Sequence, residues 1–223
     1  MTKMKFKFAA FLLGSLALAA CSNNDNPDDG LNYYMDFVTL EANNSDGSVM
    51  TFRKEGDSPL VTLTSTTTFP SGYYDGERVI IQYQPLSNTR YESGPVSLIA
   101  AVPAIGEGKA PVASTAEEQS NWASGPIAIS SLWRAGEYIN MVFQATTNGD
   151  PKQVSMFVDE KTIGTSNPTL YFVYEAGEGS NARNYTFYGS WSIQELWENP
   201  ATTSLTIFFA DPSSTVNTVV LKK

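Results

Sequence analysis

Short runs of alternating apolar and polar residues, separated by turn residues, constrain this chain more than any other feature. One run covers 33–42, the turn Asn44-Ser45-Asp46-Gly47 follows it, and 48–54 alternates again. Asp-Gly between two such runs predicts a β-hairpin, because both residues tolerate a positive φ. Further runs lie at 60–66, 78–83 and 96–102. Five short strands so close together predict a small closed or half-closed barrel.

A second series of strands is expected after the stretch 106–111, which is small and charged and is the best candidate for a domain boundary. The segment 113–124 is expected to be loosely structured or helical. The strands expected after it are 127–133, 138–145, 154–158, 170–175, 185–191, 204–209 and 216–221. Inward faces are expected at Ile139/Met141/Phe143, Phe187/Trp191 and Leu205/Ile207/Phe209, each at a spacing of two. Strands at this spacing predict a β-sandwich, with one helical turn expected from Ser192.

The first twenty residues have the form of an export signal. Three lysines precede an uncharged apolar run at 8–18, which is shorter than the roughly 20 residues that a membrane-spanning helix needs. The run ends in Leu18-Ala19-Ala20-Cys21, a bacterial lipobox. The sequence therefore predicts a lipoprotein with a signal peptide at 1–20, cut before Cys21, and with Cys21 carrying diacylglycerol and an amide-linked palmitate.

A polar tether is expected at 21–32, because this stretch is small and acidic and has nothing to bury. Its aspartates resemble surface-export signals of Gram-negative anaerobes, and a simple solvated linker is the alternative. Both interpretations stay open, so the protein is expected on the outer membrane, at its periplasmic face or at the cell surface.

Composition excludes several functions. Removing residues 1–20 leaves 11 basic and 23 acidic residues, a net charge of −12, which repels nucleic acid and anionic lipid head groups. The chain has no histidine, and its one cysteine is Cys21. The commonest general base and metal ligand are thus missing, and no thiol is left for catalysis. We predict no catalytic residue, no cofactor, no metal site and no enzymatic activity.

Aromatic residues outside the expected strands are the candidates for ligand binding. Tyr73, Tyr74, Trp122 and Trp197 lie in loop-like sequence, where flat rings can stack on sugars. Trp133 and Trp191 lie in expected strands, and we predict that they belong to the sandwich core.

Several segments resemble NigD-like lipoproteins over nearly all of the mature chain. The resemblance rests on the segments 34–40, 52–60, 76–83, 125–127 and 136–143, with Trp133 between the last two. It implies an N-terminal domain of OB type at 33–108 and a C-terminal, immunoglobulin-like β-sandwich at 109–223, in an all-β chain. The family is typical of gut and oral Gram-negative anaerobes. Its name comes from a bacteriocin operon, for which an immunity role was suggested, and its function is otherwise unassigned. No catalytic residue is carried over, and relatives often have histidine in later strands where this chain has none.

Two functions are consistent with these observations. The first is a non-catalytic envelope lipoprotein that binds another protein as an accessory or immunity-like module. The alternative is a surface glycan-binding protein that assists carbohydrate uptake. In either case the membrane is contacted through the lipid anchor, and the partner is an envelope protein or a glycan.

Overall fold

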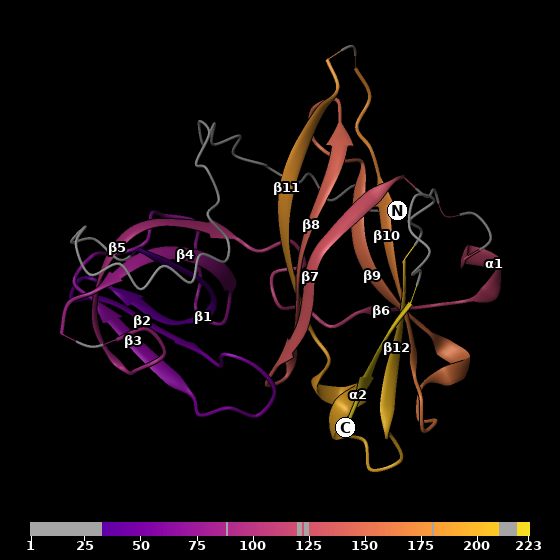
Figure 1. Ribbon diagram of the computed structural model, residues 1–223, viewed down its shortest axis with the longest axis horizontal. Helices are drawn as coiled ribbons and strands as arrows, with labels where there is room; N and C mark the ends of the chain where they lie inside the picture. The colour runs from indigo at the N-terminus through magenta and orange to yellow at the C-terminus, as the bar shows by residue number, and fades with distance from the viewer. Residues whose placement is uncertain (1–32, 88, 120–121, 123–124, 180, 210–217) are drawn as a thin grey trace. The chain divides into compact units, whose positions relative to one another are not determined.

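Five strands in the N-terminal half of the computed structural model close into a barrel in the order β1-β2-β3-β5-β4 (Figure 1). The structure describes residues 33–223 except 88, 120–121, 123–124, 180 and 210–217. The expected five-stranded, OB-like barrel is confirmed. Its strands are β1 (Tyr34–Asn44), β2 (Gly47–Phe52), β3 (Val61–Ser65), β4 (Arg78–Pro85) and β5 (Gly94–Pro103).

Closure of the barrel depends on β1, which pairs with two neighbours in turn. Its first half, up to Thr39, pairs antiparallel with β4, and the half from Thr39 onward pairs with β2. The register shifts between Leu40 and Ala42, and an extra residue of this kind bends a strand and increases its twist. β3 and β5 then pair in parallel at Leu63 and Gly94, which closes the ring.

The barrel core follows from alternation along each strand. Successive side chains point to opposite faces of a strand, so every second residue faces inward. The buried cluster inside the barrel consists of Val38, Leu40, Met50, Phe52, Val61, Leu63, Phe69, Val79, Ile81, Tyr83 and Val96.

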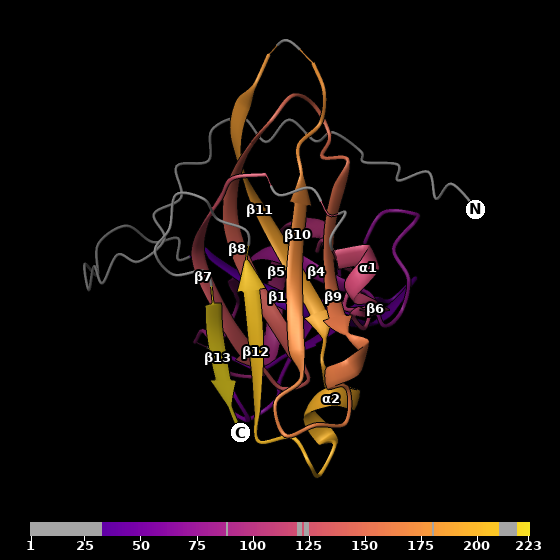
Figure 2. The same ribbon diagram turned by 90° about the vertical axis from the view of Figure 1, so that its right-hand side faces the viewer.

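The remaining strands form two sheets that face each other as a sandwich (Figure 2). The five-stranded sheet has the order β13-β12-β10-β9-β6, and the three-stranded sheet has the order β11-β8-β7. β10 pairs in parallel with β12, and β9 with β6. The strands are β6 (Val112–Ser114), β7 (Ile127–Ala135), β8 (Tyr138–Thr147), β9 (Gln153–Asp159), β10 (Thr169–Glu175), β11 (Arg183–Ser192), β12 (Ser204–Phe209) and β13 (Thr218–Lys222).

The expected inward faces of the sandwich are confirmed. The two predicted trios and the predicted pair all belong to one core cluster, with Phe187 partly buried at its margin. Trp191 is 3% exposed, and its ring lies 5.7 Å from that of Phe172, edge to face. Helical structure is limited to α1 (Ala116–Gln119), η1 (Glu160–Thr162) and α2 (Gln194–Glu198) among the described residues.

Trp133 does not lie in the sandwich core, so that part of the prediction is wrong. It packs at a third cluster, where buried Phe37, Ile80 and Ala104 of the barrel side meet residues of the three-stranded sheet. The Trp133 and Phe37 rings are 5.5 Å apart, edge to face. Trp133 points outward because it lies on the face of β7 opposite Leu132, which packs against the sandwich core.

A buried arginine reinforces the junction between barrel and sandwich. Arg78 donates from Nε to Ser190 Oγ, from Nη1 to Thr39 Oγ1 and from Nη2 to Asn140 Oδ1, each at 3.2 Å. Its guanidinium lies 4.2 Å from the centre of the Tyr138 ring. Burial lowers the pKa of Arg78 to about 10, so the side chain is still charged at neutral pH.

The stretch after β5 is also held by the sandwich. Ile105 exchanges backbone hydrogen bonds with Tyr188 and Ser190 of β11, and Gly108 N donates to Ser190 O at 3.0 Å. Asn32–Lys223 form one compact unit. The division of the chain at 20, 32 and 108 stays a prediction, and the signal peptide and Cys21 lie outside the described residues. No helix in the described part is long and apolar enough to span a membrane.

Candidate functional site

The four residues expected to form a platform lie on separate elements. Tyr73 is partly buried against the barrel core, where its ring is 5.2 Å from that of Phe69. Its hydroxyl donates to Ala101 O at 3.0 Å. Tyr74 is 48% exposed, and its hydroxyl donates to Glu107 Oε2 at 3.0 Å. Burial and the Glu107 carboxylate raise the pKa of Tyr74 to about 12. Both tyrosines are thus engaged within the protein.

Trp197 does not lie in a loop, and its use as an exposed platform is corrected. It belongs to α2 and packs in the sandwich core at 9% exposure. The Arg134 guanidinium lies 4.6 Å from its ring centre, and Lys223 Nζ donates to its carbonyl oxygen. The short helix that follows Ile193 turns the indole inward.

Trp122 joins a row of aromatic side chains on the sandwich. Its ring stacks on Phe157 at 4.7 Å and 22°, and it lies 5.5 Å from Tyr171 at 57°. Tyr171 in turn stacks with Phe208 at 5.5 Å and 21°. We call these four residues the outer aromatic row.

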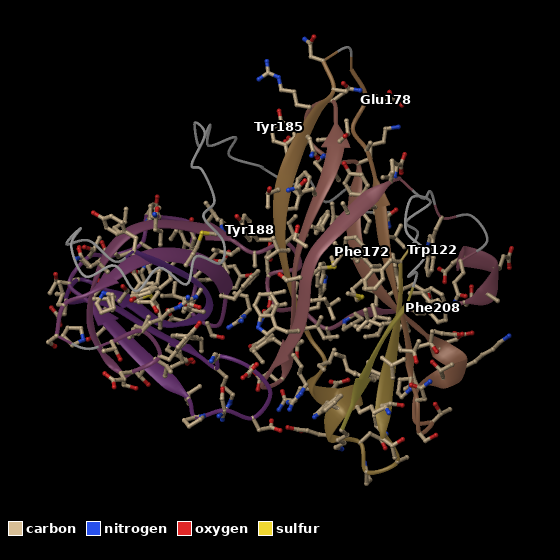
Figure 3. The ribbon with its side chains drawn as sticks, in the orientation of Figure 1. Trp122, Phe172, Glu178, Tyr185, Tyr188 and Phe208 are labelled. Atoms are coloured by element: carbon tan, nitrogen blue, oxygen red, sulfur yellow. The ribbon has the colours of Figure 1, made fainter. Side chains whose placement is uncertain are left out.

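The row crosses the outer face of the five-stranded sheet. Phe157 of β9 is opposite Tyr171 of β10, and Tyr171 is opposite Phe208 of β12. Their chain neighbours face the core, as Phe172 does between the two sheets, whereas Trp122 and Phe208 lie on the far side of the five-stranded sheet (Figure 3). Phe208 is 39% exposed, and Val112, opposite Phe157 on β6, is 64% exposed.

Sequence reasoning missed Phe157, Tyr171 and Phe208, because it considers ligand-binding rings only outside the expected strands. Each follows or precedes a core residue directly, so alternation alone places it on the solvent face. The sign available in the sequence was that adjacent positions such as Tyr171 and Phe172 are both aromatic, and only one of them can face inward.

A cavity of about 370 Å³ adjoins one end of the row. Trp122 and Phe157 form its aromatic wall. The three residues of β6 and Glu118 of α1 form the rest. The cavity therefore offers an aromatic surface beside a carboxylate whose Oε2 already accepts from Thr115, whereas the Ser114 hydroxyl is buried and donates to Val158 O.

A second cluster lies at the end of the barrel where β4 ends and β5 begins. The Arg90 guanidinium lies 5.1 Å from the Tyr34 ring centre and 4.6 Å from that of Tyr91. Arg90 Nη2 pairs with Asp36 Oδ1 at 3.0 Å, and the Tyr83 hydroxyl donates to Asp36 Oδ2 at 2.9 Å. We call Arg90 with Tyr34, Tyr91 and Asp36 the arginine clamp.

Electrostatics show that the clamp is partly buried. Burial raises the pKa of Asp36 above its usual value of 3.8, and the hydrogen bonds and charge of Arg90 oppose this only in part. Tyr91 has φ 70°, a conformation that non-glycine residues seldom adopt. The Arg90 side chain keeps 34% of its surface exposed, so the clamp presents a fixed cation to solvent.

Metal ligands are not gathered in the described residues: no group of three or more histidine, cysteine, aspartate or glutamate side chains lies close enough to hold an ion. The lipidation residue predicted at Cys21 lies outside the part of the chain that the structure describes.

Comparison with known proteins gives matches in structure alone. No family model and no curated protein matches the sequence. A DUF1344 protein of unknown function from Bacteroides vulgatus is 14% identical at a TM-score of 0.65, covering 86% of this chain and 91% of that one. A putative toxin-related protein from Parabacteroides distasonis is 13% identical at a TM-score of 0.60, covering 86% and 92%.

A NigD-like immunity protein from Bacteroides caccae is also similar. It is 17% identical at a TM-score of 0.56, and the match covers 84% of this chain and 91% of that one. At such identities the likeness is one of fold. The resemblance to NigD-like proteins that the sequence predicts is confirmed at that level, over both the barrel and the sandwich.

Proposed function

We propose that this chain is a non-catalytic lipoprotein of the cell envelope that binds another protein as an accessory module. The observation that carries the proposal is the arginine clamp, a partly exposed cation fixed between two tyrosine rings. The likeness of fold to a NigD-like immunity protein supports it, and an immunity role is the specific form that this neighbour suggests.

The clamp has the chemistry of an interface hot spot. Arginine and tyrosine are enriched among residues that dominate protein–protein binding, because they present large contact areas at low entropic cost. Asp36 and the two rings hold the Arg90 fork in one orientation, so little side-chain freedom is lost on binding.

Apolar side chains lie at the same end of the barrel. Leu60 directly precedes β3, and Leu86 directly follows β4, with exposures of 52% and 63%. The Leu86 backbone N–H donates to Pro95 O of β5, which places the residue beside the start of that strand. A cation framed by apolar and aromatic groups fits a partner surface that carries a carboxylate within an apolar setting.

A photo-crosslinking amino acid tests this surface in the full-length lipoprotein in its native host. Placed at Leu86, it should give one discrete protein adduct, and Arg90→Ala in the same chain should remove that adduct. Placed at Ile163, which is 46% exposed on the sandwich, it should give none. Equal adducts from both positions, or an adduct at Leu86 that survives Arg90→Ala, would refute the assignment.

Anchoring is tested separately. Cys21→Ser should abolish incorporation of labelled palmitate and release the protein from the outer membrane. Protease added to intact cells then distinguishes the cell surface from the periplasmic face. Labelled palmitate in the Cys21→Ser variant would contradict the lipid anchor without bearing on the clamp.

A further inference from the structure

The outer aromatic row is accompanied by a row of hydroxyl groups on the same face of the sheet. Thr169 lies two residues before Tyr171 on β10, and Thr206 lies two residues before Phe208 on β12, so each shares a face with its aromatic neighbour. Thr169 and Thr206 are directly opposite each other. The sheet therefore presents an aromatic row and a hydroxyl row side by side.

Asn167 extends the polar row with an amide. Its Nδ2 donates to Thr206 Oγ1 at 2.9 Å, and its Oδ1 accepts from Ser204 Oγ at 2.9 Å. Thr206 Oγ1 also donates to Asn167 Oδ1 at 3.0 Å, so the hydroxyl hydrogens of Ser204 and Thr206 are both used within this cluster. The second hydrogen of Asn167 Nδ2 and the hydroxyl lone pairs are left for a ligand. Hydroxyl and amide groups of this kind exchange hydrogen bonds with sugar hydroxyls at little cost.

The dimensions of the row fit a chain of rings. Neighbouring strands are about 4.8 Å apart, which is close to the length of one pyranose residue. Phe157, Tyr171 and Phe208 occupy three adjacent strands. Trp122 covers one face of Phe157, and Tyr171 and Phe208 stack on each other, so a saccharide chain would run along the outer edges of these rings, one sugar unit to a strand. Sugar rings place C–H groups against aromatic surfaces and direct their hydroxyls to the sides. The cavity walled by Trp122 and Phe157 adjoins this end of the row, where the terminal sugar ring would lie.

Charge selects among saccharides. The mature chain carries −12, and Asp159 lies near enough to Tyr171 to contribute to the raised pKa of its hydroxyl, although burial is the larger cause. A polyanionic glycan or nucleic acid would be repelled. We propose that the outer aromatic row is a binding site for an uncharged oligosaccharide, with one sugar ring beside Trp122 and the following units over Tyr171 and Phe208. This site is separate from the arginine clamp and does not depend on it.

Calorimetric titration of the full-length protein in detergent tests the proposal. The probes are neutral hexasaccharides of glucose, xylose, mannose and N-acetylglucosamine, with oligogalacturonate as the charged control. At least one neutral probe should bind, and oligogalacturonate should not. Phe208→Ala and Trp122→Ala should each weaken that binding at least tenfold. Tyr185→Ala removes an equally exposed ring from β11 of the other sheet and should leave binding unchanged.

Thr206→Val keeps the proposal testable if an aromatic variant is unstable, because valine retains the shape of the threonine side chain and removes only its hydroxyl. It should weaken binding at least threefold with an unchanged melting temperature. The proposal would be overturned if the wild type bound no neutral probe. It would also be overturned if Phe208→Ala and Thr206→Val both bound a neutral probe as tightly as the wild type does. If no saccharide probe bound, but an envelope protein was crosslinked to this face and Phe208→Ala abolished that crosslink, the ligand of the row would be a protein instead.

Discussion

Replacing Trp191 by alanine should destabilise the sandwich more than any other single change of an aromatic residue on β11. Its side chain is 3% exposed, and it contacts Phe172 edge to face. A buried tryptophan removes about 200 Å² from water, which at about 25 cal/mol/Å² corresponds to about 5 kcal/mol. Measured losses for such truncations are about 3 to 5 kcal/mol. Since domains have about 5 to 15 kcal/mol of stability, the variant should be close to unfolding.

Two glycines show how closely the indole is surrounded. A Cβ built on Gly106 would lie 2.7 Å from Trp191 Cδ1, and one built on Gly189 would lie 2.5 Å from Trp191 Cζ3. The surrounding backbone therefore cannot collapse easily into the space that alanine leaves. A cavity that stays open places the cost at the upper end of the range.

Urea denaturation followed by far-UV circular dichroism measures this effect without relying on the tryptophan that is removed. With a slope of about 2 kcal/mol/M, a loss of 4 kcal/mol lowers the midpoint by about 2 M. Tyr185→Ala, on the same strand but 44% exposed, should shift it by less than about 0.5 M. A shift below about 0.5 M for Trp191→Ala, with an unchanged slope, would refute the reasoning and make Trp191 a surface residue.

Three further predictions follow from the same contacts. Gly106→Ala and Gly149→Ala both place alanine at a φ above +80°, but only the new Cβ at 106 meets Trp191. In urea unfolding, Gly106→Ala should therefore lose about 1 to 3 kcal/mol more unfolding free energy than Gly149→Ala. The raised pKa of Asp36 means that the folded chain ionises it less readily than the unfolded chain. The stability that Asp36 adds relative to Asp36→Asn is therefore fully present below pH 3.8 and falls as pH rises, so the difference in unfolding free energy should be larger at pH 3 than at pH 7. Trp133→Ala should weaken the contact with Phe37 and separate one unfolding transition into two in calorimetry, whereas a single unchanged transition would contradict a coupled junction.

The sequence predicts the barrel and the sandwich because their strands alternate cleanly. Leu205, Ile207 and Phe209 face inward at every second position, and that pattern specifies both the strand and its buried face. The bulge near Ala42, which lets β1 pair with two partners, leaves no comparable pattern. The resemblance to NigD-like proteins implies the two fold types, an OB-type barrel and a β-sandwich. Strand order is not predicted, since alternation says nothing about which strands are neighbours.

The candidate sites were harder to predict, because they depend on side chains that are brought together from distant positions. The loop-like sequence around Trp122 identifies it as a candidate, but its partners Phe157, Tyr171 and Phe208 lie in expected strands, where no ligand-binding ring is predicted. Trp197 fails for the opposite reason: a short helix turned it inward. Arg90 and Asp36 are 54 positions apart, and no local spacing connects them.

Exposed aromatic groups on the solvent face of a sheet need a physical explanation beyond folding. They remain partly hydrated in the folded state, so they contribute less to stability than the buried rings of Phe172 or Phe209. They also favour association between molecules, especially beside edge strands such as β6 and β13, which are kept to three and five residues. A net charge of −12 opposes that association through mutual repulsion. Polar residues on this face would avoid the tendency to associate, and the proposed oligosaccharide site gives these rings a role that offsets it.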